Sequence, residues 1–162
     1  MLTSVIRAII FDLDGTLVHS LSGIAKALNT ILEHHQLPTH SQSTVRTFIG
    51  DGIVKLVERA CPDGYDPGQM AELTGEVSNE YATAWRDGTV PYTGVNETLT
   101  ALLQSGTKIA VLSNKPHAFC QQITDLILYH RSFDRKSCCY VDLKIDDFDD
   151  TALTTAVETG NL

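Results

Sequence analysis

The sequence predicts an α/β protein whose core is a Rossmann-like parallel sheet with an all-helical insertion. Two aliphatic runs, residues 5–10 and 108–112, have the length and the β-branched composition of strands that are buried on both faces. Helical periodicity fills the stretch between them, and a helical pattern follows each run, as crossovers between parallel strands require. We therefore expect a core made of residues 1–15 and 91–162 and an insertion made of residues 16–90.

Two acidic residues follow the first predicted strand. Residues 11–17 read FDLDGTL, which places Asp12 and Asp14 directly after the aliphatic run. Because side chains alternate along an extended chain, both acids point the same way, and Gly15 allows the backbone to turn sharply. Open α/β sheets bind ligands at the carboxyl ends of their strands, so we expect the two carboxylates to share one small site there.

Two carboxylates this close repel each other unless a shared proton or a cation relieves the repulsion. Mg2+, a hard ion that prefers oxygen ligands, is the cation that suits them best. One carboxylate then binds the metal and attacks an electrophile, while the other transfers a proton. The alternative is an Asp-Gly turn that closes the strand and leaves both acids solvated.

The FDLDGTL string after a hydrophobic strand resembles the first motif of the haloacid dehalogenase (HAD) superfamily of phosphatases, D-x-D-G-T-[LV]. The resemblance implies that Asp12 is the nucleophile that forms an aspartyl phosphate. It also implies that Asp14 is the general acid and base, and that both residues contribute to a Mg2+ site, Asp14 through its backbone carbonyl.

The insertion is predicted to begin with a helix that starts near Ser20 and ends near His34, with apolar residues at helical spacing. Residues 41–61 read as two short helices broken at residues 50–52, and a longer helix covers residues 67–85. An all-helical insertion after the first strand resembles the cap of HAD phosphatases, which closes on the substrate.

The break between the two short helices consists of Gly50, Asp51 and Gly52. With its flanking residues it resembles the cap segment of phosphoglycolate phosphatases, which implies that the loop faces the active site and helps to select the substrate. The alternative is an ordinary interhelical turn. Nearby cations either give the cap a positive side for a substrate carboxylate or are solvated surface residues. They are Arg46, Lys55 and Arg59.

The second aliphatic run ends in Ser113, Asn114 and Lys115, and Pro116 then suits the first turn of a helix. Backbone N–H groups at a helix N-terminus attract anions, and a hydroxyl beside them can orient a phosphoryl group. The segment resembles the second HAD motif, which implies that Ser113, Asn114 and Lys115 bind phosphate. The alternative is that Ser113 is a simple N-cap.

The family resemblance ends near Phe133. A complete member continues with a Lys that neutralises the phosphate and a strand ending in Gly-Asp-x-x-x-Asp that completes the metal site, and neither string occurs here. Asp146 follows the YVD string of residues 140–142 and is the candidate third metal ligand, and Lys136 or Lys144 is the candidate replacement for the missing Lys. The alternative is a solvated acidic tail and an incomplete metal site.

Composition narrows the classes of function. The sequence has 12 Lys and Arg against 20 Asp and Glu, a net charge of −8, which argues against sustained contact with nucleic acid or an anionic membrane. No run reaches the length of a membrane span or has the form of a signal peptide, so we expect a cytoplasmic protein. The four cysteines match neither a disulfide framework nor a zinc site, and the adjacent Cys138 and Cys139 are expected in a strand.

The expected function is Mg2+-dependent hydrolysis of a small phosphomonoester, similar to 2-phosphoglycolate, by a phosphatase of the HAD type. The alternative is a catalytically impaired remnant that binds phosphate or a protein partner, because the Lys and Gly-Asp strings are missing. A phospho-accepting receiver domain is a third candidate, but that class carries its acceptor Asp on a later strand, where this chain has Ser113.

Overall fold

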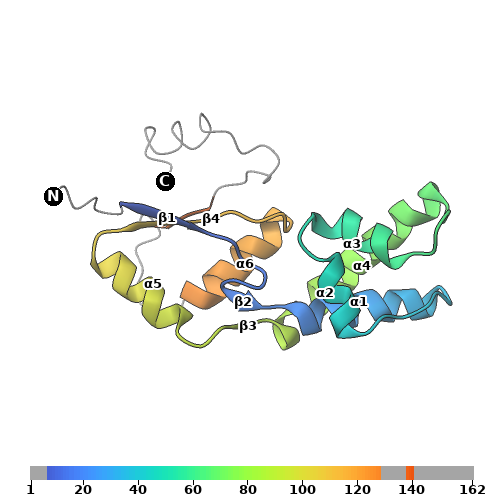
Figure 1. Ribbon diagram of the computed structural model, residues 1–162, viewed down its shortest axis with the longest axis horizontal. Coiled ribbons are helices and arrows are strands. Elements are labelled where there is room, and N and C mark those ends of the chain that lie inside the picture. Colours follow the sequence, from blue (N-terminus) through green and yellow to red (C-terminus); the bar gives the residue numbers. More distant parts are fainter. Residues whose placement is uncertain (1–6, 129–137, 141–162) are drawn as a thin grey trace. The chain divides into compact units, whose positions relative to one another are not determined.

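The computed structural model describes residues 7–128 and 138–140 (Figure 1). The chain folds into two compact units. Unit 1 consists of Met1–Leu17 and Pro91–Leu162, and unit 2 consists of Val18–Val90. Unit 2 is therefore one continuous stretch that interrupts the sequence of unit 1.

Unit 1 contains a parallel sheet with the strand order β1-β4-β5. Its strands are β1 (Ala8–Phe11), β4 (Lys108–Val111) and β5 (Cys138–Tyr140). Val111 pairs with Phe11 on one side and with Tyr140 on the other. The carboxyl ends of β1 and β4 therefore lie side by side at one edge of the sheet.

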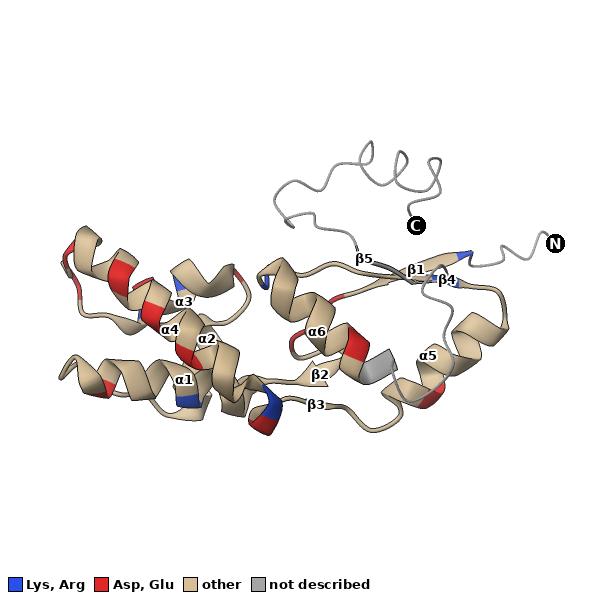
Figure 2. Ribbon diagram, turned by 180° about the vertical axis from the view of Figure 1, so that it is seen from behind, with Lys and Arg blue, Asp and Glu red and all other residues tan. Residues whose placement is uncertain are grey.

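Two helices connect these strands. α5 (Val95–Gln104) precedes β4, and α6 (His117–Leu128) joins β4 to β5. Both helices lie on the same face of the sheet in both ribbon views (Figures 1 and 2). β4 and the two helices contribute these buried side chains to the core of unit 1: Leu99, Ile109, Ala110, Val111, Phe119, Cys120 and Ile123. The predicted parallel α/β core is confirmed.

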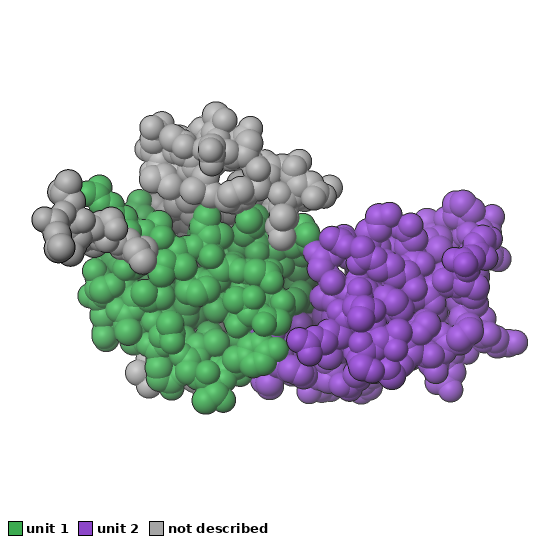
Figure 3. All heavy atoms as spheres, viewed as in Figure 1, with its two compact units in different colours: residues 1–17, 91–162 green, residues 18–90 purple. Residues whose placement is uncertain are grey.

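Unit 2, drawn in purple in Figure 3, is built mainly from helices, which Figure 1 labels. They are α1 (Leu21–His34), α2 (Gln42–Phe48), α3 (Gly52–Ala60) and α4 (Pro67–Gly88). Their buried apolar side chains form a separate core: Leu28, Leu32, Val45, Leu56, Val57, Leu73, Val77 and Trp85. Helical periodicity predicts all four helices, although α4 continues three residues past the expected end at Trp85.

Short strands lie where the chain enters and leaves unit 2. β2 (Val18–His19) and β3 (Val90–Pro91) form a two-stranded sheet. The sequence does not predict them, because a two-residue strand is too short to show the alternation by which strands are recognised.

The start of α1 packs closely against the end of α4. Ser22 Oγ donates a hydrogen bond to the Gly88 carbonyl at 3.0 Å, and a Cβ atom on Gly88 would lie 2.5 Å from the Cα atom of Gly23. Ser20 occupies the N-cap of α1 as expected, but its side chain makes no capping hydrogen bond. The two helices approach this closely because neither residue 23 nor residue 88 has a side chain.

α4 is an amphipathic helix. Pro67 stands in its first turn, and the Asp66 side chain caps it by accepting a hydrogen bond from Gln69 N at 3.0 Å. Acidic positions recur along the helix in Figure 2, while Leu73, Val77, Tyr81 and Trp85 form its buried apolar face. Among the helices of residues 7–128, none combines the length and the apolar character needed to cross a membrane.

Candidate active site

Asp12 and Asp14 lie directly after β1. The strand ends at Phe11, and Asp12 is the next residue. Leu13 is fully buried, whereas Asp12 is exposed and Asp14 is half-buried. This alternation places Leu13 in the core and the two flanking acids on the other side of the chain. The carboxylates are close enough for the charge of Asp14 to raise the pKa of Asp12.

A tight turn follows the acids. The Leu13 carbonyl accepts hydrogen bonds from the N–H groups of Thr16, at 3.3 Å, and Leu17, at 3.0 Å. Gly15 has a φ of +83°, a left-handed conformation that glycine adopts without strain. The turn fixes the backbone on both sides of Asp14, and Tyr92 N–H then donates to the Leu17 carbonyl at 3.1 Å.

The carboxyl end of β4 lies beside these acids. Leu112 N–H donates a hydrogen bond to the Phe11 carbonyl at 2.9 Å. Asp12 is the residue after Phe11 and Ser113 is the residue after Leu112, so this bond brings the two site residues to neighbouring strand ends. Ser113 is buried, and its Oγ accepts a hydrogen bond from Lys115 N–H at 3.3 Å. The segment leads directly into the N-terminus of α6.

A buried ion pair joins the two loops. Lys115 Nζ lies 3.1 Å from Asp14 Oδ1 and 3.0 Å from Asp14 Oδ2, and the two side chains are 5% and 15% exposed. Water screens such a pair far less than one on the surface. The sequence predicts Lys115 as a phosphate ligand but does not predict this partner. Asn114, the remaining predicted phosphate ligand, is half-buried between Ser113 and Lys115.

Asp12 has a perturbed environment. Although the residue is exposed overall, desolvation of its carboxyl group raises its pKa above the ordinary value of 3.8, and the charge of Asp14 raises it further. Hydrogen bonds from the Leu13 backbone and the Thr16 side chain, together with the charge of Lys115, act in the opposite direction. Ionised Asp12 is thus less favourable in the folded protein than in water, and a bound cation would relieve that cost.

Similarity to known proteins assigns this arrangement to a family. A family model of haloacid dehalogenase-like hydrolases matches residues 9–140. The chain belongs to the haloacid dehalogenase-like hydrolases. Its relatives include phosphoglycolate phosphatases from Pectobacterium atrosepticum, 39% identical over 117 residues, and Pseudomonas syringae pv. tomato, 36% identical over 132 residues. These matches cover 70% and 78% of this chain and 50% and 48% of the relatives, so the chain spans about half the length of the curated relatives it matches.

Solved structures share the fold of this HAD-like hydrolase. The crystal structure of a predicted phosphoglycolate phosphatase from Haemophilus somnus matches with a TM-score of 0.78 at 27% identity, over 96% of this chain and 72% of that chain. A putative phosphoglycolate phosphatase from Lactobacillus delbrueckii subsp. bulgaricus also gives 0.78, at 22% identity, over 96% and 74%. These neighbours confirm the predicted HAD-like α/β fold with a helical cap.

The donors that this HAD-like hydrolase offers after β1 suit Mg2+ in chemistry. Asp12 supplies carboxylate oxygens and Asp14 can offer its backbone carbonyl oxygen, because its carboxylate is paired with Lys115. Mg2+ usually binds one or two protein carboxylates while it keeps several waters. In the part of the chain that the structure describes, no group of three or more His, Cys, Asp or Glu side chains is placed to hold a metal ion. Asp146, the predicted third ligand, lies outside the described residues, as do Lys136 and Lys144. The fit therefore depends on the two acids.

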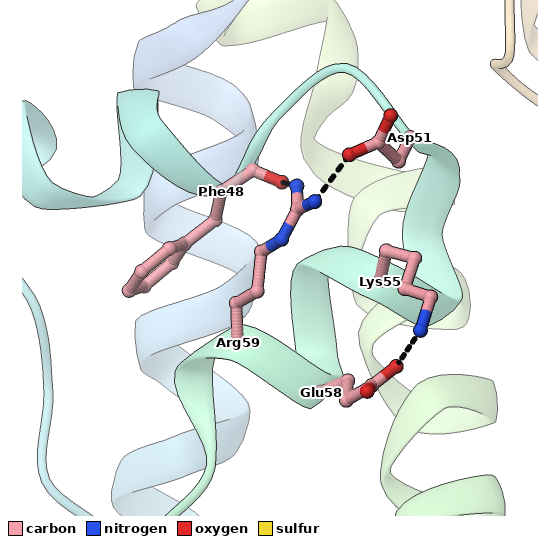
Figure 4. Close-up of polar contacts among 5 residues, drawn as sticks. All are labelled: Phe48, Asp51, Lys55, Glu58 and Arg59. Carbon is pink, nitrogen blue, oxygen red and sulfur yellow. Dashed lines mark hydrogen bonds and ion pairs between the residues drawn. The ribbon is translucent and has the colours of Figure 1, made fainter.

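The predicted specificity loop, residues 50–52, lies in unit 2 between α2 and α3. Asp51 forms an ion pair with Arg59, and Lys55 pairs with Glu58 at 2.6 Å (Figure 4). Two of the three cations that the sequence offers as a positive side of the cap thus have acidic partners. That the loop faces the acids after β1 stays a prediction.

Proposed function

We propose that this chain hydrolyses a small phosphomonoester similar to 2-phosphoglycolate, with Mg2+ held by Asp12 and Asp14. One observation carries the proposal: the acids after β1 meet the segment after β4, and the buried Lys115–Asp14 ion pair joins them. The names of the relatives support the same substrate class. The net charge of −8 favours a small substrate that local positive groups attract over a polyanion such as nucleic acid.

Asp12 acts as the nucleophile in this proposal. Its carboxylate attacks phosphorus, the bond from phosphorus to the ester oxygen breaks, and Asp14 protonates the leaving alkoxide. The chain then carries an aspartyl phosphate at residue 12. Asp14, now a carboxylate, takes a proton from water, whose oxygen attacks phosphorus and releases inorganic phosphate and the free Asp12 carboxylate. When bound, Mg2+ would neutralise the negative charge that develops on the phosphoryl oxygens.

Lys115 and Ser113 orient and stabilise charge around these steps. Because Lys115 Nζ contacts both carboxylate oxygens of Asp14, it stabilises the anion that Asp14 becomes after giving up its proton. Ser113 Oγ accepts the Lys115 N–H, so its own proton can be donated to a phosphoryl oxygen. Backbone N–H groups near Asn114, ahead of α6, add further donors.

The two parts of the chain have different roles in this proposal. We infer that residues 1–15 and 91–162 form the catalytic core and that residues 16–90 form the cap. Unit 2 has an apolar core of its own and contains none of the residues assigned to phosphoryl transfer. Selection of the substrate then falls to the cap loop of Gly50, Asp51 and Gly52.

A second candidate function is a phosphate-binding module without turnover. It is favoured by the absence, among the described residues, of a third metal-ligating side chain beside Asp12 and Asp14. With two acids alone the affinity for Mg2+ falls, because this ion has few protein ligands and each one matters. Such a module would bind inorganic phosphate through Ser113 and Lys115.

Hydrolysis assays distinguish these functions. The full chain and its Asp12→Asn variant are assayed with 2-phosphoglycolate and p-nitrophenyl phosphate, with Mg2+ and with a chelator. We expect Mg2+-dependent release of phosphate by the wild type and a loss of about a hundredfold or more in the variant, because an amide cannot serve as the nucleophile. Wild-type turnover in Asp12→Asn would remove residue 12 from this role. Phosphate binding without hydrolysis would support the binding module.

A further inference from the structure

The cap loop has a backbone that requires glycine. α2 ends at Phe48 and α3 begins at Gly52. Gly50 and Gly52 have φ values of +130° and +84°, which other residues rarely adopt. A Cβ atom at Gly50 would meet nothing within 4 Å. Glycine is therefore needed at residue 50 because of the backbone conformation and not because a side chain would clash.

Arg59 supplies contacts to both sides of the loop (Figure 4). Its Nη1 donates to the Phe48 carbonyl at 3.0 Å, and its Nη2 forms an ion pair with Asp51 Oδ2. The guanidinium comes from the last turn of α3 and so reaches back over the helix to the loop that precedes it. Its planar fork of donors can hold a carbonyl and a carboxylate at once, which a Lys ammonium on a flexible chain does less well.

Asp51 is used here in an unusual way. It is the N-cap residue of α3, a position where Asp normally accepts a hydrogen bond from the first turn, yet its side chain makes no capping bond. The carboxylate binds Arg59 instead. The N-terminus of α3 therefore lacks a side-chain capping bond, and Asp51 instead connects the loop to the C-terminal turn of α3.

The other flank of the loop is held independently. The Phe48 ring packs edge to face on His40 at 5.2 Å between centroids. His40 Nε2 lies 2.8 Å from the Ala60 carbonyl, and Asn29 exchanges two hydrogen bonds with the His40 backbone, at 2.8 and 2.9 Å. Arg59 then adds a contact at each end of the loop, to the Phe48 carbonyl and to the Asp51 carboxylate.

The ion pair contributes little to overall stability. The Arg59 and Asp51 side chains are 39% and 57% exposed, and exposed pairs are worth little because water screens them. Its effect is local: it cancels the charge of Asp51 on a loop to which we assign contact with an anionic substrate. Without Arg59, the Asp51 carboxylate would repel a substrate carboxylate.

We propose that Arg59 is a positioning residue for substrate selection. It fixes the backbone of residues 48–52 and neutralises Asp51, so that the carboxylate-bearing part of an anionic substrate binds more tightly. This inference rests on the proposed function, in which the same loop selects the substrate.

The test compares Arg59→Met with Glu58→Gln in the full chain. Glu58→Gln removes the neighbouring exposed pair with Lys55 on the same helix and leaves the contacts of Arg59 in place. We measure kcat and KM with 2-phosphoglycolate and with p-nitrophenyl phosphate, which has no carboxylate. Arg59→Met should raise KM for 2-phosphoglycolate about fivefold, with little change in kcat or in the aryl substrate. Arg59→Lys should restore part of the loss, because it keeps the charge.

Three results would overturn the inference: an unchanged KM in Arg59→Met, an equal change in Glu58→Gln, or an equal loss with both substrates. If the wild type hydrolyses neither substrate, the proposed function fails, and hydrogen exchange then decides the role of Arg59. Amides of residues 49–52 should exchange faster in Arg59→Met than in Glu58→Gln. Equal protection in the two variants would show that Arg59 does not fix the loop.

Discussion

Lys115 Nζ contacts both carboxylate oxygens of Asp14, at 3.0 and 3.1 Å, across 101 residues of sequence. This contact brings a positive charge from the end of β4 to the acids at the end of β1. Under the proposed function, a cation beside the nucleophile would neutralise charge on the phosphoryl oxygens. Lys115 is the candidate for that charge among the described residues of the site.

Removing this cation should reduce turnover more than it reduces folding. In Lys115→Met we expect kcat to fall about a hundredfold, because the carboxylate of Asp14 and the phosphoryl oxygens lose their nearest positive partner. Steady-state kinetics measure the effect, and circular dichroism reports whether the variant is folded. Lys26→Met, which removes an exposed cation from α1, is the matched control. Equal kinetics in Lys115→Met and Lys26→Met would contradict the role.

The raised pKa of Asp12 should make stability depend on pH. Because its folded pKa lies above the ordinary value of 3.8, its contribution to stability is fully present below 3.8 and is lost as the pH rises through the folded pKa. In Asp12→Asn this loss is absent. The variant should therefore gain stability relative to the wild type as the pH rises from 3.8 towards neutrality.

Urea unfolding in the presence of a chelator measures this difference at each pH, because bound metal would obscure it. A free energy difference between Asp12→Asn and the wild type that stays constant from acid to neutral pH would show that the carboxyl group is not perturbed.

Mg2+ should stabilise the folded chain through the same acids. A ligand that binds only the folded state raises stability by about 2.7 kcal/mol when its concentration is a hundred times Kd. Thermal unfolding with increasing Mg2+ should therefore raise the Tm of the wild type. The increase should be smaller in Asp12→Asn and should be retained in Asp87→Asn, which removes an exposed acid from α4. The same increase in all three proteins would indicate unspecific binding.

The close contact of α1 and α4 predicts that Gly→Ala substitutions at two positions of α4 change stability in opposite directions. Gly88→Ala would place a Cβ atom 2.5 Å from Gly23 and should destabilise the chain by about 1–3 kcal/mol, because the helices must separate. Gly75→Ala on the same helix meets nothing within 4 Å and should stabilise it by about 0.5–1 kcal/mol. Urea unfolding measures both. A Gly88→Ala variant as stable as Gly75→Ala would show that the backbones do not approach closely.

Local sequence was sufficient for the parts of the site that strand geometry determines. Aliphatic runs identify β1 and β4, parallel pairing aligns their carboxyl ends, and Asp12, Asp14 and Ser113 then have to lie at one edge. The helices of unit 2 follow in the same way from their apolar periodicity.

Contacts of long side chains could not be predicted in this way. Lys115 and Asp14 are far apart in sequence, and the partner of a flexible Lys depends on which rotamer the folded loop allows. Asp51 stands at the N-cap of α3, where an Asp side chain is expected to accept a hydrogen bond from the first turn. It forms an ion pair with Arg59 instead. Spacing alone gives no means of choosing between these outcomes.

The helical unit is an uninterrupted stretch, Val18–Val90, bounded by the paired strands β2 and β3. A gene can therefore exchange the whole unit through two junctions without altering a codon for Asp12, Asp14, Ser113 or Lys115. Under the proposed function, proteins descended from one ancestral hydrolase can differ in substrate while they keep the same catalytic residues.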